Sequence, residues 1–315
     1  MPRLIDAQTD EVIDLDTLLD LVDGGGFDAR DEDNFASFGL ALKKLANNRD
    51  FLTDLVLAEL KARCERQLRD NQYTSQVILL PTRSPKYIMR ANFWPSANDS
   101  IVKNSGVDPF FYGVPHDHNF SFLTVGYLGT GYWSEYYEYD YENVAGHVGE
   151  SVDLKFVEKS RLEQGKVMLY RAHRDVHNQL LADEMSISLN ILETDYSIGF
   201  REQYRFDLER GTISGLLNMT PLEPLLALSA HFGGGNGQDL LADFATRHPS
   251  ERMRWKALEA QAGALAGVDD RIALFAAATH GSSRFIAGMA RRKIETLEAT
   301  RHWIEREEPQ LQAAE

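Results

Sequence analysis

The middle of this chain consists of short stretches rich in β-branched and aromatic residues, and this pattern restricts the fold more than any other feature. Turn residues separate the stretches, and no helical segment lies between them. Seven strands are expected, at SQVILLP (75–81), KYIMRANFW (86–94), FSFLTVGYLG (120–129), GYWSEYYEYD (131–140), VDLKFVEKS (152–160), GKVMLYRA (165–172) and EMSISLNILE (184–193). In the last of these, Ile187 and Leu189 share one face while Ser188 and Asn190 share the other. The pattern predicts an antiparallel barrel or sandwich.

Helical periodicity flanks this β region on both sides. Between about residues 10 and 70, apolar residues recur three and four positions apart, interrupted by the glycine-rich run at 24–33. After Arg210 the helical period returns with Leu216 and continues to about Trp303, and GGGNGQ at 233–238 is expected to be a flexible loop. We predict an α+β chain with an N-terminal helical region at 1–72, a β-barrel domain at 73–210 and a C-terminal helical region at 211–315.

Three histidines in the β region form a candidate metal site. His116 and His118 are two residues apart in an expected strand, so their side chains point to the same face. Gly165 opens a later strand, a turn follows at 171–175, and His177 begins the strand that returns. A barrel can bring this third imidazole to the first two. Neutral imidazole suits iron, zinc, copper and nickel, and three ligands leave positions open for substrate.

These residues resemble two sequence motifs of the cupin superfamily. The HDH run at 116–118 looks like the first motif, and the glycine-opened strand that leads to His177 looks like the second. The resemblance covers about residues 76–200 and implies a double-stranded β-helix barrel with a metal centre. A glutamate ligand usually follows the first motif by four or five residues, but Phe122 and Leu123 stand there in this chain. The resemblance therefore implies a site of three histidines.

A site without the glutamate is similar to that of the cysteine and other thiol dioxygenases, which hold ferrous iron. That resemblance implies an iron-dependent dioxygenase that acts on O2 and on a small-molecule or amino-acid-like substrate, and this substrate could be a thiol. Arg90 corresponds to an arginine that pairs with the substrate carboxylate, and Tyr196 is the candidate for a tyrosine that orients the substrate. The Ser-x-His-x-Tyr run of cysteine dioxygenases has no counterpart at 188–192. A different substrate, or a different oxygenase reaction on the same iron, is therefore given the same weight as oxidation of cysteine.

Other polar residues near the motifs have alternative roles. His173 lies four residues before His177 and is a candidate ligand or catalytic base. Asp117 points away from its two neighbours in a regular strand, which suggests a structural role. Glu135 or Glu138 could complete a four-ligand site or could lie on the outer face.

Composition narrows the partners and the compartment. The net charge of −15 disfavours nucleic acid, and no apolar run approaches the roughly 18 residues that span a membrane. The acidic N-terminus does not resemble a secretory signal, and a single cysteine, Cys64, forms no internal disulfide. We expect a cytoplasmic protein, with a possible homodimer or a peptide substrate held by the helical flanks.

Three classes of function follow from these features. The first is an Fe(II)-dependent oxygenase. The second is an isomerase, lyase or hydrolase, in which zinc, nickel or manganese serves as a Lewis acid. The third is a binding or regulatory module without catalysis. Fold resemblance does not decide among them.

Overall fold

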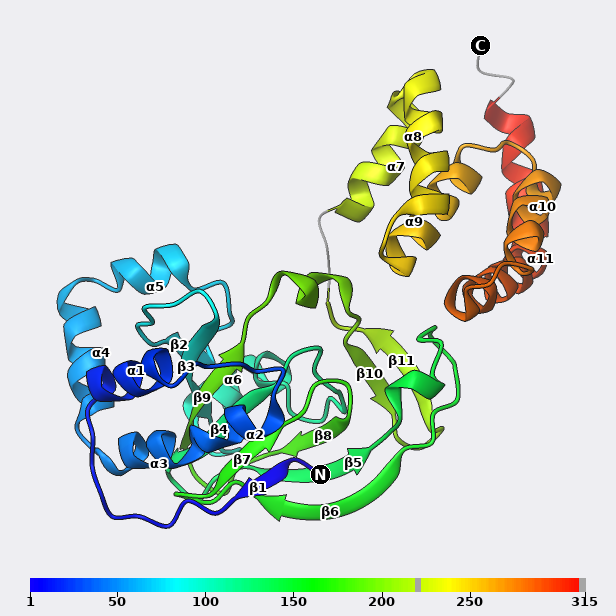
Figure 1. The fold of residues 1–315 in the computed structure, drawn as a ribbon. Coiled ribbons are helices and arrows are strands. Elements are labelled where there is room, and N and C mark those ends of the chain that lie inside the picture. Colours follow the sequence, from blue (N-terminus) through cyan, green and yellow to red (C-terminus); the bar gives the residue numbers. More distant parts are fainter. Residues whose placement is uncertain (219–221, 312–315) are drawn as a thin grey trace. The chain divides into compact units, whose positions relative to one another are not determined.

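The computed structural model describes residues 1–218 and 222–311 (Figure 1). The chain divides into two compact units. The first consists of Met1–Tyr141, Val152–Ile198 and Gln203–Gly211, and the second of Glu142–Ser151, Gly199–Glu202 and Thr212–Glu315. The first unit therefore contains both the N-terminal helices and the candidate metal site.

A six-stranded antiparallel sheet forms the centre of the first unit. Its strands lie in the order β1-β7-β4-β9-β3-β2. Their bounds are β1 Arg3–Ile5, β2 Val77–Leu79, β3 Tyr87–Trp94, β4 Phe122–Leu128, β7 Val167–Tyr170 and β9 Ser186–Glu193. Every residue of β9 is buried, because neighbouring strands pair with both of its edges and both of its faces are covered. Short β1 was not expected from the sequence.

A smaller antiparallel sheet, in the order β6-β5-β8, makes up the second layer of strands. It contains β5 Trp133–Glu138, β6 Lys155–Arg161 and β8 Asp175–Leu180. Among the described residues the strands pair into separate sheets and do not close into a barrel, so the prediction of antiparallel strands is confirmed but that of a closed barrel is not. Aromatic side chains fill the interior of this region, including Tyr136 of β5, Phe122 of β4 and Tyr170 of β7.

The N-terminal helices cover one face of the six-stranded sheet (Figure 1). They are α1 Leu15–Gly24, α2 Glu32–Ser37, α3 Gly39–Asn47 and α4 Phe51–Lys61, and they are followed by α5 Glu65–Asp70, which has no buried residue. The Asp14 carboxylate caps α1 by accepting a hydrogen bond from the Thr17 amide at 2.8 Å. Leu42 of α3 is fully buried in the same core cluster as Leu189 of β9. The expected helical period is thus confirmed, and it serves to bury this face of the sheet.

The residues between β3 and β4 connect the strands without forming a regular strand of their own. They include α6 Ser100–Ser105 and the short 3-10 helix η1 Asp108–Phe110, so the expectation that no helical segment lies between the strands was wrong here. Two further 3-10 turns are η2 Tyr141–Asn143 and η3 Tyr196–Phe200, and strand β10 covers Tyr204–Asp207. Contrary to expectation, His116 and His118 lie in an extended segment before β4, where His116 forms single β-bridges with His177 and Arg205. Strand β8 begins at Asp175, two residues before His177.

The second unit is mainly helical. It contains β11 Thr212–Leu216, α7 Leu222–Phe232, α8 Gly234–Arg247, α9 Glu251–Gly263, α10 Val268–Ala278 and α11 Arg284–Leu311. Trp255, Phe275 and Phe285 share its larger core cluster. None of the described helices of the chain is both long and apolar enough to cross a bilayer.

Two expectations for this unit were wrong. Leu216 ends a strand instead of starting a helix. Residues 234–238, expected in a loop, form the first turns of α8. Gly233 and Gly237 lie against the Ser229 carbonyl, where a Cβ atom at either position would clash. These glycines therefore allow α7 and α8 to approach closely, which explains their presence near a helix start.

Candidate metal centre

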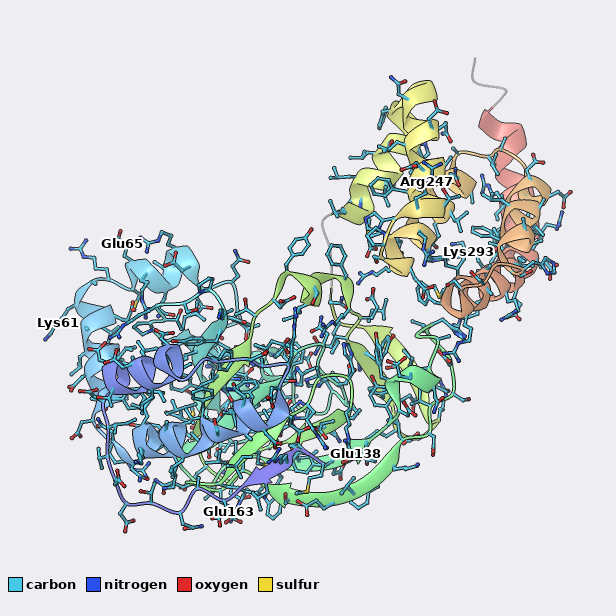
Figure 2. The ribbon with its side chains drawn as sticks, in the orientation of Figure 1. Lys61, Glu65, Glu138, Glu163, Arg247 and Lys293 are labelled. Atoms are coloured by element: carbon cyan, nitrogen blue, oxygen red, sulfur yellow. The ribbon has the colours of Figure 1, made fainter. Side chains whose placement is uncertain are left out.

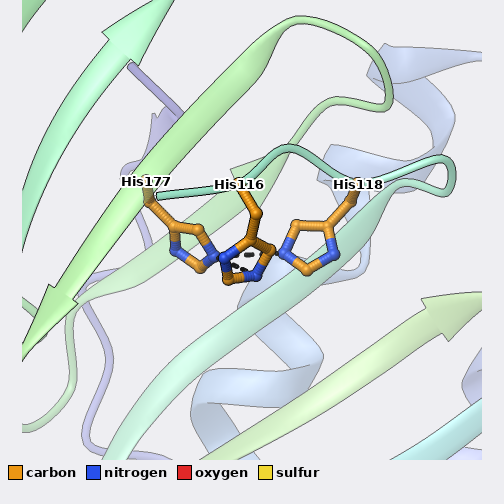
Figure 3. A group of neighbouring side chains, drawn as sticks. All are labelled: His116, His118 and His177. Carbon is orange, nitrogen blue, oxygen red and sulfur yellow. Dashed lines mark hydrogen bonds between the residues drawn. The ribbon is translucent and has the colours of Figure 1, made fainter. Parts of the chain in front are cut away.

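The imidazoles of His116, His118 and His177 converge on one point inside the first unit (Figure 3). The Nε2 atom of His177 lies 3.1 Å from that of His116 and 3.1 Å from that of His118. All three side chains are buried. Two backbone hydrogen bonds of 3.0 Å join His116 to His177 and hold the extended segment beside β8. Residues that are 59 positions apart are thus brought into one cluster, as the sequence predicts.

Burial sets the protonation state of the cluster. It lowers the pKa of His116, and it lowers the pKa values of His118 and His177 well below the ordinary range, because the charged imidazolium would be desolvated. Positive charge on His116 or His177 would further lower the pKa of His118, and positive charge on His116 would lower that of His177. The Nδ1 of His116 lies 2.6 Å from the Val114 carbonyl oxygen, which can only accept, so Nδ1 carries the proton and Nε2 keeps its lone pair. Neutral imidazoles with free lone pairs are the form that binds metal.

The donor set fits a first-row divalent metal ion. Metal–nitrogen bonds of about 2.1 Å place two ligand atoms about 3.0 Å apart at a right angle and about 3.4 Å apart at a tetrahedral angle. The two separations of 3.1 Å from the His177 Nε2 fall between these values, and all three ligand atoms lie within 4.8 Å of one another. The His177 Nδ1 is buried without a hydrogen-bond partner among the described residues. His116, His118 and His177 could therefore hold one ion, and three imidazoles alone do not choose among iron, zinc, nickel and copper.

Asp117 anchors the segment that carries the first two histidines. Its carboxylate is fully buried and accepts hydrogen bonds from the Tyr139 hydroxyl and the Tyr204 amide, each at 2.6 Å. The Gln203 amide donates to the Asp117 carbonyl oxygen at 2.8 Å. Because Asp117 is held on the side of the chain opposite to the imidazoles, its role is to fix the backbone between them, and it lies outside the cluster of potential ligands.

A cavity of about 340 Å³ opens onto the three histidines. Aromatic side chains line part of it, among them Trp94, Phe120, Phe122 and Tyr132. Arg90 of β3 also lines the cavity, with its guanidinium carbon 5.0 Å from the centre of the Tyr73 ring. Burial lowers the pKa of Arg90, because its charge is desolvated. Arg90 is the one permanently charged side chain among the described residues that line the cavity, and none of these residues is Asp or Glu.

The structure places the other predicted residues away from this cavity. His173 has a left-handed backbone (φ 59°), packs against the Tyr141 ring at 4.0 Å between ring centres with the planes tilted by 38°, and has its Nδ1 3.8 Å from the Asp117 carboxylate. Its backbone amide donates to the His118 carbonyl at 2.8 Å. Tyr196 is 86% exposed in η3 and is not among the described residues that line the cavity. His173 is therefore placed to support the ligand segment instead of binding beside the other imidazoles.

Neither glutamate of β5 reaches the cluster. Glu135 lies opposite Asn178 in the strand register and accepts a hydrogen bond from its amide at 3.0 Å, whereas Tyr136 lies opposite His177. The side chain of Glu135 therefore projects from the other face of the sheet. Glu138, labelled in Figure 2, pairs with Arg171 at 3.0 Å. The alternative of a four-ligand site completed by these carboxylates is not borne out by the described residues.

Sequence reasoning missed the polar residues that share the cavity with Arg90. Asn92, Gln179 and Asn190 line it and are each at least 94% buried. Asn92 follows Arg90 by two residues in β3, and Gln179 follows His177 by two residues in β8, so each shares a face with the functional residue before it. This two-residue spacing was visible in the sequence and could have identified both.

Comparisons with known proteins do not assign the chain to a family. No family model matches it, and neither does any curated protein. Among solved structures, a DMSP lyase from Ruegeria pomeroyi DSS-3 matches at 11% identity and a TM-score of 0.23, over 41% of this chain and 54% of the lyase chain. A salicylate 1,2-dioxygenase from Pseudaminobacter salicylatoxidans matches at 9% identity and a TM-score of 0.25, over 44% of this chain and 33% of the dioxygenase chain.

A further match is a cupin domain from Bordetella pertussis Tohama I. Its identity is 10% and its TM-score 0.23, and the match covers 40% of this chain and 98% of that domain. This chain thus spans about half or less of the length of the two enzymes above. At these identities and scores the matches carry no information about activity. Activity depends on the residues of the site and not on the fold.

Proposed function

We propose that this chain is a non-heme Fe(II)-dependent dioxygenase that acts on a small carboxylic acid. The observation that carries the proposal is the composition of the cavity: three neutral imidazoles converge in it, Arg90 supplies the charge, and no carboxylate is found among its described lining residues. When bound to the three histidines, ferrous iron would supply redox chemistry with dioxygen at positions that the protein leaves open.

The side chains of the cavity support an anionic substrate. The Arg90 guanidinium can hold a carboxylate through two parallel hydrogen bonds, and such a partner offsets the cost of burying its charge. The Nε atom of Arg90 is buried without a hydrogen-bond partner among the described residues, so it remains available as a donor. The carboxylate would thereby be oriented with the rest of the molecule toward the histidines.

The size of the cavity limits the substrate. A volume of about 340 Å³ corresponds to about eleven water molecules at about 30 Å³ each, or a molecule of roughly ten non-hydrogen atoms. The indole of Trp94 and the ring of Tyr132 lie 4.0 Å apart between centres and give this space an apolar wall that limits water. We therefore propose a small molecule as the substrate.

Metal content is the first test. Protein purified without added metal should contain about one iron per chain, and a His116→Ala, His177→Ala double variant should lose it. The matched control is His231→Ala, which alters an exposed histidine of α7. A folded wild-type protein without metal would refute the metal-dependent function.

Oxygen uptake with a panel of small carboxylic acids then tests the reaction class. Consumption that depends on the acid, on iron and on Arg90 supports the dioxygenase. Conversion of an acid at an unchanged rate under argon would overturn it in favour of the isomerase, lyase or hydrolase class, in which the metal is a Lewis acid.

A further inference from the structure

The cavity contains a set of neutral polar groups that the dioxygenase proposal does not use. The amides of Asn92, Asn190 and Gln179 are 6%, 3% and 5% exposed. One polar atom of each, the Asn92 Oδ1, the Asn190 Nδ2 and the Gln179 Oε1, has no hydrogen-bond partner among the described residues. A buried polar group without a partner costs about 1–3 kcal/mol. Three such groups around one cavity indicate that a ligand completes their hydrogen bonds.

Strand register shows where these amides lie relative to Arg90 and the histidines. Asn190 of β9 stands directly opposite Arg90 of β3, and Asn92 follows Arg90 on the same face. Gln179 is two residues beyond His177 on β8. The amides therefore line the same cavity as the Arg90 guanidinium and the imidazoles, where they would contact substituents near the carboxylate of a bound acid.

The charge of the cavity decides which substituents fit. Arg90 is positive, a bound divalent metal would add positive charge, and the described lining residues include no carboxylate. A substrate ammonium group would be buried beside these charges without a counter-ion, which is strongly unfavourable. A hydroxyl group is neutral and both donates and accepts one or more hydrogen bonds, as an amide does. The amides thus match a hydroxyl better than an ammonium group.

We propose that the substrate is a hydroxyl-bearing carboxylic acid and that Asn92, Asn190 and Gln179 determine this specificity. This inference rests on the proposed function for the location of the site, but it concerns recognition and not the reaction with oxygen. It excludes zwitterionic amino acids, which Arg90 alone would also accept.

The test measures binding to zinc-loaded protein, because zinc is not redox-active and the readout is then independent of oxygen chemistry. The probes share one skeleton of suitable size: 3-phenylpropanoate, its derivatives with a hydroxyl at C2, at C3 or on the ring, and phenylalanine. Isothermal titration calorimetry should show at least one hydroxy acid binding about tenfold or more tighter than both 3-phenylpropanoate and phenylalanine. Tightest binding by the unsubstituted acid or by phenylalanine, or no binding by any of these acids, would overturn the proposal.

Variants assign the preference to the amides. Asn190→Leu and Asn92→Leu should each reduce the preference for the hydroxy acid while 3-phenylpropanoate still binds. Asn178→Leu is the matched control, since Asn178 faces Glu135 on the other side of the same small sheet, and it should leave the preference unchanged. Arg90→Gln should weaken all acids and retain the hydroxyl preference. Two independent amide variants, each checked by thermal unfolding, keep the test valid if one of them fails to fold.

The outcomes separate this inference from the proposed function. A hydroxyl preference that both leucine variants lose, without oxygen uptake on the iron-loaded protein, would support the specificity and refute the dioxygenase. Oxygen uptake with an amino acid as substrate would support the dioxygenase and refute the specificity. A hydroxyl preference that persists in both leucine variants would overturn the role of the amides.

Discussion

Replacing Asp117 with leucine should weaken both the fold and the metal site, because this one carboxylate fixes the segment between two of the three histidines. Asp117 is fully buried, and its oxygens accept from the Tyr139 hydroxyl and the Tyr204 amide at 2.6 Å. Leucine has nearly the same size but no acceptor. The change therefore removes hydrogen bonds without opening a large cavity.

The magnitude follows from the two donors that lose their acceptor. Hydrogen bonds to a charged group contribute about 1.5–3 kcal/mol each, so Asp117→Leu should lower the free energy of unfolding by about 3–6 kcal/mol. Tyr139→Phe removes one of the two donors and should cost about half as much. Substituting a residue that orients metal ligands typically lowers metal affinity by about 10–100-fold, and we expect Asp117→Leu to weaken zinc binding by an amount in this range.

Urea unfolding measures the first effect, and competition with a chromophoric chelator measures the zinc dissociation constant. The double variant Asp117→Leu, Tyr139→Phe completes a mutant cycle, and its cost should be well below the sum of the single costs because the two residues share one hydrogen bond. If Asp117→Leu changes the unfolding free energy by less than about 1 kcal/mol and leaves zinc affinity intact, the anchoring role is wrong.

Three further predictions concern stability. In the folded metal-free protein the three buried histidines stay neutral, whereas in the unfolded chain they bind protons below a pH of about 6.5. The free energy of unfolding should therefore be constant above that pH and fall below it, by up to about 4 kcal/mol per pH unit for three sites. A flat profile in urea titrations from neutral to mildly acidic pH would contradict this. Gly131→Ala should cost about 2–4 kcal/mol, since φ is 80° and the new Cβ would clash with the Leu162 carbonyl, and thermal unfolding would detect it. Leu42→Ala, in the core between α3 and the sheet, should cost about 2–5 kcal/mol in the same assay, and a loss below about 1 kcal/mol would mean that the helix packs elsewhere.

The predicted strands could be read from the sequence because they depend on short-range alternation, whereas the histidine cluster was inferred from the resemblance of its two motifs to those of cupins. In β9, Leu189 and Ile191 face the helices while Ser188 and Asn190 face the opposite side, as their two-residue period requires. Arg90 lines the cavity with the histidines, but it was named from the resemblance to the thiol dioxygenases and not from this period. Local sequence was sufficient for the face on which a side chain lies.

Features that depend on distant pairing could not be read in this way. Strand β1 contains three residues and exists because it pairs with β7, more than 160 residues later. His116 and His118 were expected in a strand ladder, but their segment is held by isolated bridges from His116 to His177 and Arg205 and by the carboxylate of Asp117. Leu216 lies next to residues with helical periodicity and was expected to begin a helix, but it ends strand β11 in the structure.

The way the ligand segment is held links metal binding to folding. Because His116 and His118 lie outside a continuous ladder, their positions depend on Asp117 and on the bridges from His116 to Arg205 and to His177. His177 itself carries the third imidazole. An ion bound by all three rings would cross-link this segment to β8 in the folded state only, and would stabilise that state by an amount that grows with its affinity. The sequence HDH thus combines two functions within three residues: its histidines face the cavity, while its aspartate, on the opposite side of the chain, fixes the distance at which they can bind.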